Sequence, residues 1–231
     1  MKIVYHIGSE VIMTEKTGIV FSIAEINEPP RRSVVENTVY ENYGYQVRHY
    51  SIAKNMTIVP ERYTHHTLYF INQGTLHIEY KVDDVPEEIV IGEGRSMIRP
   101  AYMLCGFYAD EDCVFTELIL PSTSNISPLL SEGKIFCLPD MLSFRQNNTY
   151  EIRLIDDRDL QFSIYSLDKG TKLHIASDMT YIFVTILSGE GEITEKDSTY
   201  TIGENESFCS AENEVTLSSE GRMKLMVLFC R

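Results

Sequence analysis

The stretch HYSIAKNMTIVPERYTHHTLYFINQGTLHI, residues 49–78, has a second copy in the chain, IYSLDKGTKLHIASDMTYIFVTILSGEGEI, at residues 164–193. The two align without a gap at an offset of 115 residues, so that Tyr50 meets Tyr165 and Gly74 meets Gly189. Further on, IGEGRSM (91–97) meets IGENESF (202–208) at an offset of 111. The first copy therefore carries four more residues (115 − 111), which we place in its hairpin KVDDVPEEI. Two blocks aligned in the same order indicate an internal repeat.

Short runs of Val, Ile, Phe, Tyr and Thr, separated by Gly, Asn, Asp or Pro, predict β-strands joined by turns. Such runs include GIVFSIAEI, YGYQVRHYSI, VFTELILP, LQFSIYSL and MKLMVLFC. Helical turns are expected only between residues 125 and 148, one of them near Ser127, and this stretch is the natural linker. We therefore predict an all-β chain: an N-terminal barrel with extra N-terminal strands at 1–122, a linker with short helical turns at 123–150, and a C-terminal barrel at 151–231.

Bulk composition narrows the range of partners. The 231 residues include 34 acidic and 20 basic side chains, for a formal charge of -14, and no Lys/Arg-rich run offsets this field. We therefore expect neither nucleic acid nor an anionic membrane surface as a partner. The N-terminus lacks the apolar core of a signal peptide, and none of the five cysteines forms a CxxC pair. These features predict a cytoplasmic protein with reduced thiols.

The order of strands and turns in each copy resembles the cupin superfamily, whose conserved region has two motifs separated by a hairpin. The resemblance covers roughly residues 45–120 and 160–230 and places Gly74 and Gly94 at the glycines of the two motifs. It implies two tandem double-stranded β-helix (jelly-roll) barrels, a bicupin, assembled as a homodimer. The second copy, through its GEGEIT and ESF segments, is also similar to the C-terminal barrel of class I phosphomannose isomerases.

The resemblance also supplies a test for a metal site. In the family, the metal ligands of the first motif stand thirteen, eleven and seven residues before the glycine, where this chain has Glu61, Tyr63 and Thr67. The histidine of the second motif is replaced by Cys105. Alternation along a strand gives His65 the same inner face as these positions and turns its neighbour His66 to the opposite face. We therefore prefer a polar cavity without a cofactor, and the alternative is a divalent transition metal held by Glu61, His65 and Cys105.

The second copy has fewer possible ligands. Its equivalent positions hold Ala176, Asp178 and Ile182, with Thr216 in place of the last histidine at the offset of 111. A transition metal needs several convergent donors, and this set offers Asp178 alone. We therefore expect the second barrel to be structural or to form part of an interface.

Candidate binding residues gather in the first copy. Aromatic side chains with a polar edge suit a sugar, and an arginine can bind a carboxylate through two hydrogen bonds. The candidates for binding a ligand are Arg48, Tyr63, His65, Arg99, Tyr102 and Cys105. His65 and Tyr63 are also the candidates for acid–base catalysis.

Three functions stay open. The first is a metal-independent bicupin that binds a small polar metabolite, such as a carbohydrate or sugar acid, in its N-terminal barrel. The second is a metal-dependent enzyme of the isomerase or dioxygenase type. The third is a non-catalytic scaffold or sensor. We prefer the first, because the first barrel is rich in polar and aromatic residues but poor in ion-binding ones.

Overall fold

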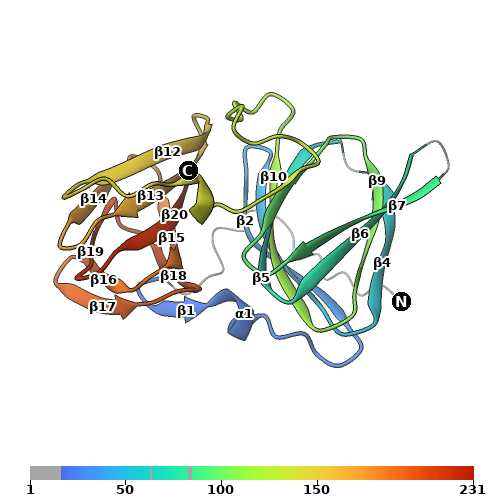
Figure 1. Cartoon of the computed structure of the whole chain (residues 1–231), viewed down its shortest axis with the longest axis horizontal. Helices are drawn as coiled ribbons and strands as arrows, with labels where there is room; N and C mark the ends of the chain where they lie inside the picture. Colours follow the sequence, from blue (N-terminus) through green and yellow to red (C-terminus); the bar gives the residue numbers. More distant parts are fainter. Residues whose placement is uncertain (1–16, 63, 83–84) are drawn as a thin grey trace. The chain divides into compact units, whose positions relative to one another are not determined.

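The computed structural model describes residues 17–62, 64–82 and 85–231, which form two compact units, each a β-barrel (Figure 1). The first unit comprises Ala24–Thr123 and Ser131–Phe136, and the second comprises 17–23, Ser124–Leu130 and Cys137–Arg231. The predicted pair of barrels is thus confirmed. The stretch between the barrels is divided between the units: Ser131–Phe136 belongs to the first, and Ser124–Leu130 and the residues from Cys137 onward belong to the second. The unit boundaries therefore differ from the expected ones at residues 122 and 150.

The first barrel, drawn in cyan and green in Figure 1, is built from two antiparallel sheets. A six-stranded sheet has the order β11-β8-β5-β10-β3-β2, and a four-stranded sheet has the order β4-β9-β6-β7. The strands are β2 (Val34–Asn42), β3 (Tyr45–Ile52), β4 (Met56–Arg62), β5 (His66–Gln73), β6 (Thr75–Val82), β7 (Val85–Gly92), β8 (Ser96–Arg99), β9 (Leu104–Ala109), β10 (Cys113–Leu120) and β11 (Ile135–Phe136).

The second barrel, yellow to red in Figure 1 apart from the blue strand β1, repeats this topology. Its sheets have the orders β1-β18-β15-β20-β13-β12 and β14-β19-β16-β17. The strands are β1 (Val20–Ser22), β12 (Thr149–Asp156), β13 (Leu160–Leu167), β14 (Lys172–Ala176), β15 (Tyr181–Ser188), β16 (Gly191–Glu195), β17 (Ser198–Ile202), β18 (Glu206–Ser210), β19 (Glu214–Ser218) and β20 (Met223–Cys230).

The repeat accounts for both the likeness of the barrels and their difference. The β6–β7 hairpin has strands of 8 residues each, whereas its counterpart β16–β17 has strands of 5. The extra residues of the first copy therefore lie in the predicted hairpin. In each six-stranded sheet, a short strand from outside the repeat pairs with an equivalent edge: β11 with β8, and β1 with β18. Pairing of this kind covers backbone groups that an edge strand would otherwise expose.

Two local predictions need correction. The run GIVFSIAEI does not continue as a strand, because β1 ends at Ser22 and a helical turn, α1 (Ile23–Ile26), follows. β1 also belongs to the second barrel, since it pairs with β18, whereas we expected all N-terminal strands in the first. In the linker, a single turn forms at the expected place, where the Leu130 N–H donates to the Ser127 carbonyl oxygen at 3.0 Å. The 3₁₀ helix η1 (Pro139–Met141) forms twelve residues further on, at a proline whose fixed φ suits the first helical position.

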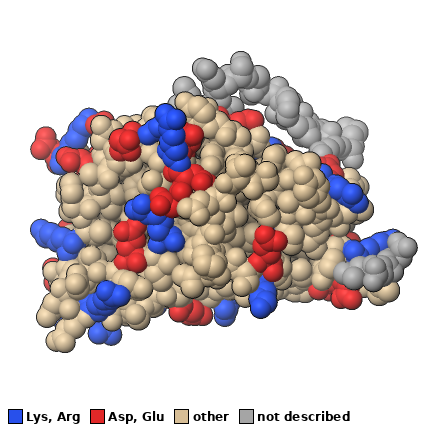
Figure 2. Space-filling view, turned by 90° about the horizontal axis from the view of Figure 1, so that it is seen from above, with Lys and Arg blue, Asp and Glu red and all other residues tan. Residues whose placement is uncertain are grey.

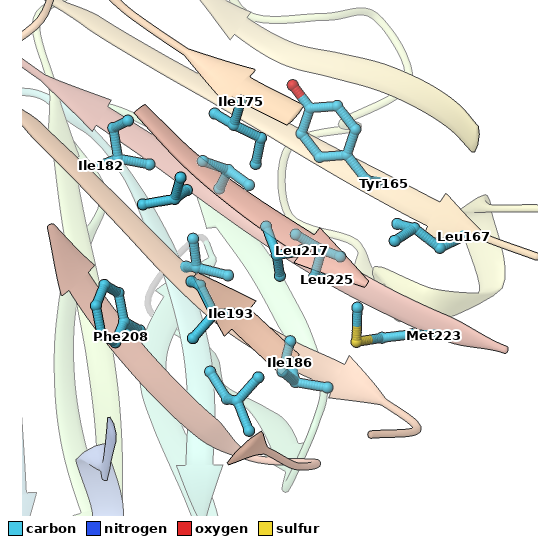
Figure 3. Packing of buried hydrophobic residues seen from close by; sticks show 14 of the residues in the cluster. Tyr165, Leu167, Ile175, Ile182, Ile186, Ile193, Phe208, Leu217, Met223 and Leu225 are labelled. Atoms are coloured by element: carbon cyan, nitrogen blue, oxygen red, sulfur yellow. The ribbon is translucent and has the colours of Figure 1, made fainter. Parts of the chain in front are cut away.

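The barrel interiors differ in chemistry. The second barrel is filled with aliphatic side chains from both sheets, and Figure 3 shows Ile182, Ile193 and Leu217 among them. The first barrel has an apolar core around Ile52, Leu76 and Phe107. In addition, it contains two buried charged residues, Arg99 and Glu117.

On the face shown in Figure 2, Lys and Arg side chains are interspersed with Asp and Glu rather than gathered into a basic surface. Within residues 17–62, 64–82 and 85–231, no helix has the length and apolar character needed to cross a membrane.

Candidate functional site

A completely buried arginine lies inside the first barrel. Arg99, at the end of β8, is 0% exposed. Its Nε donates a hydrogen bond to the Tyr69 hydroxyl at 2.9 Å, and its Nη2 donates to Thr67 Oγ1 at 2.8 Å. Its Nη1 donates to the Met103 carbonyl oxygen at 3.2 Å, and the guanidinium also forms a hydrogen bond with the Cys105 side chain. A guanidinium stays charged at any ordinary pH, so this barrel contains a permanent internal cation.

The residues that hold Arg99 come from strands that the repeat brings together. Thr67 lies directly opposite Arg99 in the β5–β8 pair, and Cys105 comes from β9 in the facing sheet. Tyr69 points inward from β5 and packs edge-on against the Phe107 and Phe115 rings, at 5.7 Å and 5.9 Å between centroids. Burial raises the pKa of the Cys105 thiol, although the adjacent guanidinium acts in the opposite direction.

A buried carboxylate is the second charged group of the interior. Glu117, on β10, is 2% exposed and lies between Arg48 of β3 and Tyr69 of β5, directly opposite both. The Tyr69 hydroxyl donates a hydrogen bond to it and thereby connects it to Arg99. Burial raises the pKa of Glu117 to about 7, and Arg48 and Arg99 lower it less than burial raises it. Glu117 therefore titrates close to neutral pH.

The charged network reaches solvent at Arg48. The exposed fraction of the side chain is 18% for Arg48 and 26% for Glu36 of β2, and the Arg48 Nη1 and Glu36 Oε1 atoms are 3.3 Å apart. The Tyr50 hydroxyl donates to Glu36 Oε2 at 2.6 Å, and its ring stacks on Phe115 with centroids 5.2 Å apart. We call the connected residues the charged cluster: Glu36, Arg48, Tyr50, Thr67, Tyr69, Arg99, Cys105 and Glu117.

The structure brings some of the predicted residues together and places others at the surface. Arg48, Arg99 and Cys105 belong to the charged cluster. His65 lies exposed in a bend before β5, and Tyr102 is 62% exposed in the turn after β8. Tyr63 lies outside the described residues.

The alternation argument holds within the strand and fails just before it. Thr67 faces the interior as predicted, as does Tyr69 two residues on, and His66 lies on the other face, where its Nδ1 is 3.2 Å from Glu132 Oε1. His65 was assigned to the inner face by the same count, but β5 begins only at His66, so the alternation does not extend to it.

Sequence reasoning did not identify Glu117 and Glu36. Glu117 is the single acid in the apolar run VFTELILP, at the same inward parity as Phe115, and this is the signal that could have found it. Glu36 gives no comparable signal, because it lies in the polar run VVENTVYEN.

The interior does not fit a metal ion. Thr67 and Cys105, two of the ligand positions predicted from the cupin resemblance, are bound to the Arg99 guanidinium, and a divalent cation there would face a fixed positive charge at close range. The described residues also contain no group of three or more His, Cys, Asp or Glu side chains placed to hold a metal. In particular, the alternative set of Glu61, His65 and Cys105 does not converge.

The second barrel lacks the charged cluster at equivalent positions. In the first barrel, Glu117 lies opposite Arg48 and Tyr69. At the equivalent positions of the second barrel, Val227 lies opposite Ser163 and Val184. The Thr67–Arg99 pair corresponds to Ile182–Ser210. The counterparts of Glu36 and Tyr50 are Glu151 and Tyr165. The counterpart of Cys105 is Val215.

Two details of the second barrel refine the comparison. The tyrosine–glutamate hydrogen bond is common to both copies, because the Tyr165 hydroxyl donates to Glu151 Oε1 at 3.0 Å. Val215 replaces the predicted Thr216 as the counterpart of Cys105. Ile78 faces Phe107 in the first barrel, and its counterpart Ile193 faces Leu217 in the second. Cys105 lies two residues before Phe107, and Val215 lies two residues before Leu217.

Comparison with known proteins identifies the fold. A cupin 2 conserved barrel domain protein from Leptotrichia buccalis superposes with a TM-score of 0.79 over 95% of this chain and 100% of its own, at 15% sequence identity. Salicylate 1,2-dioxygenase from Pseudaminobacter salicylatoxidans matches with a TM-score of 0.58 over 84% of this chain and 76% of its own, at 10% identity. No family model matches the sequence, and no curated protein is similar to it in sequence.

The chain is therefore an all-β protein whose two barrels have the cupin fold. At 10–15% identity, these likenesses show the fold and not an activity. Within the chain, the first barrel differs from the second in the residues of the charged cluster other than Glu36 and Tyr50.

Proposed function

We propose that the first barrel is a metal-independent binding site for a small polar metabolite. One observation carries the proposal: the charged cluster occupies the first barrel, whereas equivalent interior positions of the second hold mainly apolar or uncharged residues. The second barrel shows that this topology folds without Arg48 and without the buried Arg99 and Glu117. Burying charges is costly even when they are paired. Their presence in one barrel alone supports a role in binding rather than in folding.

The chemistry of the cluster favours a carbohydrate or a sugar acid. Two arginines, two glutamates and two tyrosines supply both donors and acceptors of hydrogen bonds, as a polyhydroxylated ligand requires. The resemblance of the second copy to phosphomannose isomerases agrees with such a ligand. The alternative of a metal-dependent enzyme is not favoured, because Arg99 occupies the interior beside Thr67 and Cys105, two of the predicted ligand positions.

A thermal-shift screen of sugars and sugar acids tests the proposal. We expect at least one compound to raise the melting temperature of the wild-type protein, and we expect Arg99→Met to abolish that rise. Ser210→Ala, at the equivalent position of the second barrel, is the matched control and should preserve it. Silence across a broad panel would instead favour a scaffold.

Metal analysis separates the proposal from a metalloenzyme. Protein purified without chelator should contain no stoichiometric zinc, iron or manganese. A stoichiometric metal that is lost on Cys105→Ala would overturn the proposal, because it would show that donors converge around Arg99 after all.

A further inference from the structure

Two buried polar atoms at the solvent end of the charged cluster lack hydrogen-bond partners. Within the described part of the chain, neither Arg48 Nε nor Glu117 Oε2 has a partner, and both atoms are inaccessible to solvent. Arg48 and Glu117 are directly opposite each other in the β3–β10 pair, so the two atoms belong to one small region. A buried donor or acceptor without a partner is costly, and such atoms usually meet a water or a ligand.

The two side chains do not satisfy each other. Arg48 Nη1 is 3.8 Å from Glu117 Oε2, too far for a hydrogen bond. Arg48 is held on its other side, where Nη1 is 3.3 Å from Glu36 Oε1 and Nη2 donates to Gln46 Oε1. Glu117 is held by the Tyr69 hydroxyl. Both groups are therefore fixed by separate neighbours.

The two atoms have opposite hydrogen-bonding character. Arg48 Nε can only donate, and an ionised Glu117 can only accept. A hydroxyl group does both at once, whereas a ligand carboxylate would be repelled by Glu117 and an ammonium by Arg48.

We propose that Arg48 Nε and Glu117 Oε2 together bind one hydroxyl group of the ligand, which makes the ligand a hydroxylated compound such as a sugar, a sugar acid or a polyol. This inference rests on the proposed function and adds the contact that selects the ligand. The second barrel offers no such site, because Ser163 and Val227 occupy the two positions.

Binding measurements with matched compounds test the inference. D-glucose and D-gluconate carry hydroxyl groups, and hexanoate has the carbon chain and carboxylate of gluconate without them. We expect a hydroxylated compound to bind by isothermal titration calorimetry and hexanoate not to bind. Arg48→Met and Glu117→Val should each weaken that binding at least tenfold, because each removes a charged hydrogen-bond partner. Val is the residue that the second barrel has at the latter position, and Ser163→Ala in that barrel should leave binding unchanged.

Glu117→Gln and a crystal structure guard against loss of folding. Glutamine keeps an acceptor oxygen and should bind better than Glu117→Val. In crystals soaked with the bound compound, we expect one hydroxyl oxygen within hydrogen-bond distance of both atoms. A water retained at that position, or the two side chains paired directly, would overturn the inference.

Failure of this inference and failure of the proposed function give different results. If a compound of the panel binds and both Arg48→Met and Glu117→Val bind it within twofold of wild type, the hydroxyl contact is wrong but the binding function stands. If hexanoate binds as tightly as gluconate, hydroxyl selection is likewise wrong. If no sugar, sugar acid or polyol binds at all, the proposed function falls, and this inference falls with it.

Discussion

Replacing Glu117 with glutamine should change how the first barrel responds to pH. Burial raises the pKa of Glu117 from an ordinary 4.5 to about 7, despite the opposing effect of Arg48 and Arg99. The native barrel therefore binds this proton more tightly than the unfolded chain does. The difference in pKa, 7 − 4.5, corresponds to about 3 kcal/mol. This stabilisation is complete below about pH 4.5 and is lost as the pH rises through about 7.

Glu117→Gln mimics the protonated group at every pH. We therefore expect the variant and the wild type to be about equally stable at pH 4.5. The free energy of unfolding of the variant should then exceed that of the wild type by an amount that grows with pH and levels off near 3 kcal/mol above pH 7. Subtracting the wild-type curve of unfolding free energy against pH from that of the variant cancels the titration of distant carboxylates, which both proteins share.

Urea unfolding followed by hydrogen exchange of peptides from β5 and β10 measures the first barrel without the second. Glu151→Gln, in the second barrel, serves as the control and should leave the stability of these peptides unchanged. A flat difference curve between pH 4.5 and 7 would show that the Glu117 pKa is ordinary. A difference curve that falls with pH would show that Arg48 and Arg99 lower the pKa of Glu117 by more than burial raises it. Either result would refute the reasoning.

Three further outcomes are expected. Gly74→Ala and Gly189→Ala should each destabilise the protein by at least about 2 kcal/mol in urea unfolding, because both residues have positive φ and an added Cβ would collide with a backbone carbonyl. Gly133 also has positive φ but nothing within 4 Å of an added Cβ, so Gly133→Ala should lose less stability. Equal losses of stability would contradict the steric part of this account. Native alkylation with iodoacetamide, read by peptide mass spectrometry, should label the half-buried Cys137 before the buried Cys105, and the reverse order would show that the interior is accessible. Light scattering should give a mass of about 53 kDa, twice 26.5 kDa, if the homodimer implied by the cupin resemblance forms, and a monomer mass would contradict that prediction.

The repeat made the fold predictable from one sequence. A constant offset between Tyr50 and Tyr165 fixed two copies of one unit, and the same offset recurs in the hydrogen bonds that these tyrosines make to Glu36 and Glu151. The position of the longer hairpin also followed from the change in offset. Each of these inferences depends on order along the chain, which sequence comparison reads directly.

The site was only partly predictable, because its contacts join strands that are distant in sequence. Parity placed Thr67 on an inner wall, but no linear pattern shows that an arginine from β8 binds a threonine from β5 and a cysteine from β9. Glu117 looks like an ordinary charged residue until β10 is placed between β3 and β5. His65 illustrates the opposite error, since parity was extended beyond the first residue of the strand.

The second barrel indicates which features of the first serve more than folding. Both barrels keep the glycine turns at Gly74 and Gly189 and the tyrosine–glutamate hydrogen bond, so these features belong to the architecture. At the position of Glu117 the second barrel has Val227, which fills its space without burying a charge. A buried ion network is rarely more stabilising than such apolar packing. We propose that the gain that offsets its cost in the first barrel comes from binding, through a ligand that uses the two unpartnered atoms of Arg48 and Glu117.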